Sequence, residues 1–130
     1  KALIDVGGEN LLSKLDNGIH SELTERGATL SLGERQLISF ARALAFNPQV
    51  LVLDEATSNI DSETEQMIQY AMKVVSHNRT TFIIAHRLST IQHADQIILL
   101  DNGVIKERGN HSALIQQQGT YSKMYEMQMG

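Results

Sequence analysis

The sequence predicts an α/β fold with a mostly parallel sheet core, and two kinds of segment predict it. Runs of β-forming residues at Val50–Leu53 and Thr80–Ala85 have the length and composition of strands buried on both faces. Between them, residues 62–75 show the apolar spacing of an amphipathic helix. Because strands that alternate with helices along the chain usually pair in parallel, we expect an α/β core.

The first 46 residues predict helices. Apolar residues at helical spacing between positions 3 and 15 indicate short helices, and Asn17-Gly18 ends this region. A longer helix is expected to begin at Ser31, because Ser31 and Glu34 form a capping-box pattern ahead of a periodic apolar set. Asn47-Pro48 should end this helix, since proline cannot continue it.

The second half of the chain contains further local signals. Residues 62–65 predict a second capping box at the start of the helix between the two strands. Residues 96–100 and 104–108 flank Asp101-Asn102-Gly103, which predicts a hairpin because Asn-Gly tolerates the positive φ of tight turns. Two short helices are expected on either side of Gly119. We find no internal repeat or linker and expect one compact domain at most.

Composition excludes several classes of protein. The 130 residues carry a formal net charge of −4 without a Lys/Arg stripe, so we expect no nucleic-acid partner. The absence of cysteine excludes a disulfide framework and Cys-based zinc sites. No apolar run approaches the ~20 residues that a membrane-spanning helix needs. The sequence begins at Lys1 rather than at methionine, which we interpret as a start inside a longer chain.

Two adjacent carboxylates, Asp54 and Glu55, follow the first predicted strand. Ligands of α/β proteins bind at the carboxyl edge of the sheet, and neighbouring acids repel unless a cation or separate partners stabilise them. One interpretation is that Asp54 holds Mg²⁺ while Glu55 polarises an attacking water. The other is that they form the N-cap and first-turn acid of a helix. The two residues alone leave both interpretations open.

His86 follows the second strand at the same expected edge, where a neutral imidazole can donate to a phosphate or orient water. An ordinary surface histidine is the alternative. The helix that is expected to begin at Ser31, with Gly33 in its first turn, offers free N–H donors and the positive end of its dipole to a phosphate. Considered by itself, that segment is better explained as a simple capping box.

In combination, these segments resemble the ATPase domain of ABC transporters of the exporter type, and the resemblance covers the whole chain. The corresponding segments are a signature loop at 30–36, a Walker B strand at 50–55, a D-loop at 58–61, a switch histidine at His86, the exporter loop before the signature at 21–27, and the exporter C-terminus at 110–125.

The resemblance implies the C-terminal part of a P-loop ATPase domain, with residues 1–46 in the helical signature subdomain and 47–130 in the core. The implied cofactors are ATP and Mg²⁺, with Asp54 as the Mg²⁺-associated acid, Glu55 as general base and His86 as a contact of the γ-phosphate. The residues implied to contact nucleotide are Ser31, Leu32, Gly33, Glu34, Gln36 and Asp61.

The resemblance also implies partners. Two such domains sandwich two nucleotides, so a second ABC ATPase subunit is expected. A heterodimer is favoured over a homodimer because Leu32 replaces the usual first glycine of the signature. A further departure from the family pattern is Asn59 in place of the usual D-loop alanine. A transmembrane domain, fused or associated, would touch residues 22–27 at the cytoplasmic face of the cell membrane. The implied function is export of a substrate driven by ATP hydrolysis.

No Gly-x-x-x-x-Gly-Lys-[Ser/Thr] loop is present, since none of the five lysines follows a glycine. The main phosphate cradle, the Walker A loop, is therefore expected outside these residues, and this chain alone should be inactive. One alternative is a soluble ABC ATPase that acts on DNA or ribosomes. The exporter-like segments and the negative net charge argue against this alternative. Another is that these residues serve packing only.

Overall fold

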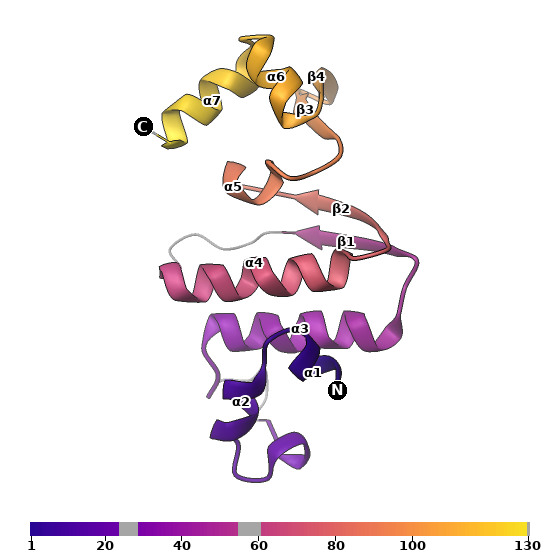
Figure 1. The fold of residues 1–130 in the computed structure, drawn as a ribbon, viewed down its shortest axis with the longest axis vertical. Helices are drawn as coiled ribbons and strands as arrows, with labels where there is room; N and C mark the ends of the chain where they lie inside the picture. The colour runs from indigo at the N-terminus through magenta and orange to yellow at the C-terminus, as the bar shows by residue number, and fades with distance from the viewer. Residues whose placement is uncertain (24–28, 55–60, 130) are drawn as a thin grey trace. The chain divides into compact units, whose positions relative to one another are not determined.

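The computed structural model describes residues 1–23, 29–54 and 61–129. The candidate base Glu55, Asn59 and most of the exporter-like loop before the signature lie outside the described residues. The chain divides into two compact units (Figure 1). The first comprises the described residues of 1–53 and 57–82, and the second comprises those of 54–56 and 83–130.

The first unit is mainly helical and confirms the local signals of its sequence. At the start of its first long helix, Ser31 Oγ accepts from the Glu34 N–H at 3.2 Å, and the Glu34 carboxylate accepts from the Ser31 N–H at 2.8 Å. Asn47 ends this helix in the left-handed conformation with φ of 49°. The elements are α1 (Ala2–Asp5), α2 (Glu9–Lys14), the 3-10 helix η1 (Gly18–His20), α3 (Leu32–Phe46), β1 (Val50–Asp54) except its last residue, α4 (Ser62–Ser76) and the first part of β2 (Thr80–Ile84).

The predicted capping box at residues 62–65 is wrong by one residue. Asp61 is the N-cap of α4: its Oδ1 accepts from the Thr64 N–H at 2.9 Å, and its Oδ2 accepts from Thr64 Oγ1 at 2.7 Å. Aspartate caps a helix at least as well as serine, so Asp61 takes the capping position ahead of Ser62.

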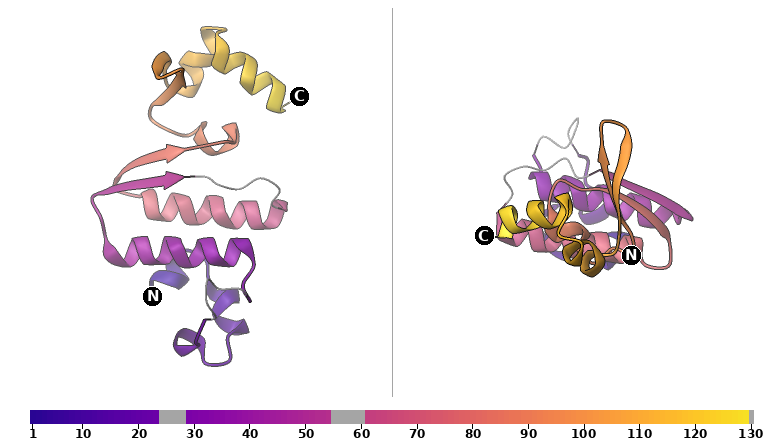
Figure 2. Two further views of the ribbon diagram at one scale, coloured as in Figure 1. Left: turned by 180° about the vertical axis from the view of Figure 1, so that it is seen from behind. Right: turned by 90° about the horizontal axis from the view of Figure 1, so that it is seen from above.

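The core of the first unit lies where α3 and α4 pack side by side, as Figures 1 and 2 show. Its buried members are Val6, Leu37, Ala41, Leu51, Ala71 and Val75. β1 contributes Leu51 to this core and pairs with β2 in a two-stranded sheet, and both arrows point the same way.

The expectation that β1 and β2 are buried on both faces is wrong. Leu51 is buried, but Val52 on β1 is 62% exposed and Phe82 on β2 is 59% exposed. Side chains alternate across a strand, and within the first unit the core with α3 and α4 covers the face that carries Leu51 and not the face that carries Val52. Both strands therefore carry more apolar side chains than this structure buries.

We expect the isolated 130-residue chain to self-associate, because apolar side chains on a two-stranded sheet with open edges favour pairing with another chain. Sedimentation velocity should show oligomers that grow with concentration. A double variant, Val52→Lys with Phe82→Lys, should sediment more slowly at equal concentration, since charge on a strand face opposes association. A wild-type chain that stays monomeric over a wide concentration range would contradict this expectation.

The second unit contains the predicted hairpin and both C-terminal helices. Asn102 and Gly103 have φ of 49° and 76°, as a tight two-residue turn requires, which confirms the hairpin. Leu88, Ile97, Leu114 and Tyr121 form the core. The elements after β2 are α5 (Leu88–Ile91), β3 (Ile97–Asp101), β4 (Val104–Gly109), α6 (His111–Gln116) and α7 (Thr120–Met129), with β3 and β4 antiparallel. Every helix among the described residues is too short or too polar to traverse a lipid bilayer.

Candidate functional site

Two of the sequence-predicted site residues lie at the carboxyl edge of the β1–β2 sheet. Asp54 is the last residue of β1, and His86 follows the end of β2 by two residues. Because the two strands pair and run in the same direction, their carboxyl ends meet at one edge (Figure 1). Both side chains are exposed, and both residues belong to the second compact unit. Glu55, the next residue along the chain from Asp54, lies outside the described residues.

The described residues at this edge offer one carboxylate, that of Asp54. Within the described ranges, no group of three or more His, Cys, Asp or Glu side chains is placed to hold a metal ion. Mg²⁺ usually keeps several waters and binds through one or two carboxylates together with substrate phosphates. A single exposed carboxylate at Asp54 fits that pattern.

The N-terminus of α3 presents four of the other predicted site residues. Ser31 and Leu32 are exposed there, and Leu32 is 42% exposed. The Glu34 carboxylate turns back to the Ser31 N–H and also pairs with Lys14 Nζ at 2.9 Å. The Ser31 N–H, and after it Lys14, hold the pKa of Glu34 below its usual value. Lys14 thus offsets the negative charge that Glu34 would present to a phosphate.

Gly33 has a packing role that the sequence analysis missed. It is buried, and a Cβ at this position would lie 2.5 Å from Thr64 Cγ2 and 3.0 Å from Met67 Cε. The first turn of α3 therefore contacts the first turn of α4, where Asp61 is the N-cap. In this way the structure brings the signature segment and the end of the D-loop segment together within the first unit.

Asp61 is engaged in helix capping. Its exposed carboxylate accepts from the backbone N–H and then from the hydroxyl of Thr64, and both hydrogen bonds hold its pKa below the usual value. The spacing of Asp61 and Thr64, a capping residue followed three positions later by its partner, could have revealed this pair from the sequence. A direct contact of Asp61 with nucleotide stays a prediction.

Gln36, the last predicted signature residue, is half-buried on α3. Its Oε1 is buried and accepts no hydrogen bond from any described group. The contact of Gln36 with nucleotide likewise stays a prediction.

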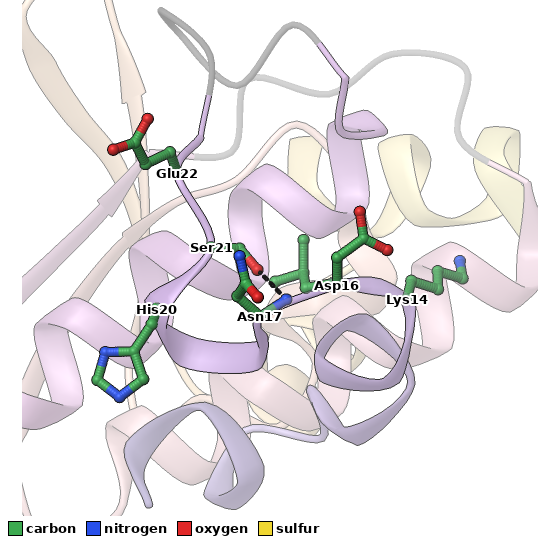
Figure 3. Close-up of a pocket in the computed structure, with 7 residues that line it drawn as sticks. Lys14, Asp16, Asn17, His20, Ser21 and Glu22 are labelled. Atoms are coloured by element: carbon green, nitrogen blue, oxygen red, sulfur yellow. Dashed lines mark hydrogen bonds between the residues drawn. The ribbon is translucent and has the colours of Figure 1, made fainter.

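A hollow of about 450 Å³ lies near α2 and η1 (Figure 3), and its lining residue Lys14 is the one that pairs with Glu34. Ser21 Oγ accepts from the Asn17 N–H at 3.0 Å inside it. It contains none of the predicted catalytic residues, but it does contain Glu22 from the exporter-like loop. Its lining residues are Lys14, Leu15, Asp16, Asn17, His20, Ser21 and Glu22.

Comparison with known proteins points to one family. The family model described as ABC transporter matches residues 5–58. The chain is 62% identical over 129 residues to a probable multidrug resistance ABC transporter ATP-binding/permease protein of Bacillus subtilis, covering 99% of this chain and 19% of that protein. It is 50% identical over 117 residues to an ATP-dependent lipid A-core flippase of Haemophilus influenzae, covering 90% of this chain and 20% of that protein.

Among solved structures, the chain resembles a bacterial Atm1-family ABC exporter with ATP bound. The TM-score is 0.84 at 41% identity, over 99% of this chain and 23% of that one. This likeness confirms the predicted α/β fold class and the resemblance drawn from the motifs. The chain spans about a fifth of the length of the curated relatives it matches.

Proposed function

Because this chain belongs to the ABC transporter family, we propose that it forms the C-terminal part of the ATPase subunit of an exporter, which couples ATP hydrolysis to movement of a substrate across a membrane. The observation that carries the proposal is the match of 99% of the chain to an ABC exporter with ATP bound. The names of the relatives describe multidrug resistance and lipid A-core flipping, which also supports export over a soluble role on DNA or ribosomes.

In this proposal, residues 1–46 form the helical signature part and residues 47–130 the core of the ATPase domain. Bound Mg²⁺ would neutralise charge that develops on the phosphates. Asp54 holds the metal from the end of β1, and Glu55 accepts a proton from the attacking water. His86 donates a hydrogen bond to the γ-phosphate from the neighbouring strand end. The positions of Asp54 and His86 at one sheet edge support this division of roles.

The signature residues serve a second nucleotide. The N-terminus of α3, with Ser31 and Leu32 exposed, contacts ATP held by a second ABC ATPase subunit, because a helix N-terminus attracts phosphate. We favour a heterodimer, in which that second subunit is a different chain. The complete protein works at the cytoplasmic face of the membrane, with a transmembrane domain that is fused or associated. The Bacillus subtilis relative, named as an ATP-binding/permease protein, supports a fused arrangement.

The complete protein, reconstituted in lipid vesicles with its partner subunit, should hydrolyse ATP only when Mg²⁺ is present. The 130-residue chain alone should not bind Mg-ATP in the micromolar range, because it has no lysine-bearing phosphate loop. A phosphate-release assay measures ATP hydrolysis by the complete protein, and titration calorimetry measures Mg-ATP binding to the isolated chain. A complete protein without ATPase activity would overturn the proposed function, whereas micromolar binding to the isolated chain would overturn only the assignment of the phosphate cradle elsewhere.

A further inference from the structure

We propose that the C-terminal helix α7 positions the segment that carries His86, and that Gln128 is a positioning residue for ATP hydrolysis. The inference rests on the proposed function, in which His86 contacts the γ-phosphate. All residues that carry it belong to the second compact unit.

The first contact joins the end of α7 to the chain just after His86. Leu88, two residues past His86, begins α5, and its N–H donates to Gln128 Oε1 at 3.1 Å. Arg87, the N-cap residue of α5, makes no capping hydrogen bond with its own side chain. A residue 40 positions away therefore caps this short helix.

The side chain of the same residue lies in a core that α7 shares. Leu88 is 6% exposed and lies in the core of the second unit together with Tyr121 of α7. Tyr125, one turn farther along α7, packs against this core. Leu88 thus donates its N–H to α7 and shares a core with Tyr121 of α7, and His86 is joined to it through a single intervening residue.

Helix α7 is itself fixed at its start. The Glu107 carboxylate, on β4, accepts from the N–H groups of Thr120 and Tyr121. The hydrogen bond from the Tyr121 N–H, and to a smaller extent that from the Thr120 N–H, hold the pKa of Glu107 below its usual value. The negative carboxylate also stabilises the positive end of the helix dipole.

His111 adds a second fixed point. Its Nδ1 lies 2.9 Å from the Tyr121 hydroxyl, and its ring meets Tyr121 and Tyr125 edge-on at centroid distances of 5.8 and 4.9 Å. β4, α6 and α7 therefore hold one another, and Gln128 extends from this assembly to the backbone beside His86. A small displacement of α7 would move that backbone and hence the imidazole.

Loss of the Gln128 contact should lower kcat with little change in KM for ATP, because misplacing a group that acts on the transferred phosphate affects the transition state most. In the complete protein, Gln128→Ala should reduce kcat about three- to tenfold, which corresponds to the loss of one hydrogen bond. Gln128→Glu should retain most of the activity, because a carboxylate oxygen also accepts from the Leu88 N–H. Gln116→Ala is the matched control, an exposed glutamine on α6 that should behave as wild type.

A double-mutant cycle with His86→Ala separates positioning from general destabilisation. If Gln128 acts through His86, Gln128→Ala should have no further effect on kcat in the His86→Ala background. Hydrogen exchange of a peptide covering residues 86–92 should also be faster in Gln128→Ala than in wild type. Wild-type kcat in Gln128→Ala, or an undiminished effect in the His86→Ala background, would overturn the inference while leaving the proposed function intact. A wild-type protein without ATPase activity would overturn both.

Discussion

Replacing Glu55 by glutamine in the complete protein should lower steady-state ATP hydrolysis about 10²- to 10⁴-fold while nucleotide stays bound. The amide has the size of the carboxylate but cannot accept the proton of the attacking water. Stabilisation of the transition state is therefore lost, whereas the contacts made in the ground state remain. The effect should be confined to kcat, because Mg²⁺ and the phosphates are held by other groups.

A steady-state phosphate-release assay measures turnover. Labelled ATP that stays with the protein through gel filtration measures bound nucleotide. Glu63→Gln is the matched control: Glu63 is an exposed first-turn acid of α4, so the same chemical change there should leave turnover unaltered. A Glu55→Gln protein that keeps half of the wild-type rate would exclude Glu55 as the general base.

Features set by neighbouring residues could be predicted from the sequence. The capping box of Ser31 and Glu34 and the turn at Asn102-Gly103 depend on side chains within four positions, and both form as expected. The sequence predicts the cap of α4 one residue too late, because Asp61 and Ser62 are adjacent residues of similar capping strength. Asp54 and His86 could be placed at one edge because Asp54 ends one strand of a parallel pair and His86 follows the other.

Features set by distant residues could not be predicted. The burial of β1 depends on which segments cover its two faces, and the apolar character of Val52 does not reveal that one face stays open. The close approach of Gly33 to Thr64 and the hydrogen bond of Leu88 to Gln128 join residues 31 and 40 positions apart. Periodicity indicates which face of a helix is apolar, but not which helix it meets.

Leu32 leads to the second large effect, a difference between the two ATP sites of the complete protein. Gly33 cannot gain a side chain without meeting Thr64, whereas the side chain of Leu32 is 42% exposed. Where the signature backbone has to approach the γ-phosphate, a four-carbon side chain should hold it back. The negative charge of Glu34 contributes less to this expected difference, because it stabilises the positive end of the helix dipole and pairs with Lys14. The site that this signature completes, on the partner subunit, should therefore be slow.

In a complex with a partner subunit that carries a regular signature, loss of Glu55 should stop nearly all turnover, whereas loss of the partner's equivalent acid should change the rate by less than about twofold. Leu32→Gly should then accelerate the slow site, measured as ATPase activity in the Glu55→Gln background, where the other site is silent. Because Leu32 is exposed, this variant should fold as wild type. The alternative is that Leu32 points away from the nucleotide and both sites work. Equal losses from the two acid variants, or a fully active homodimer of this chain, would establish that alternative instead.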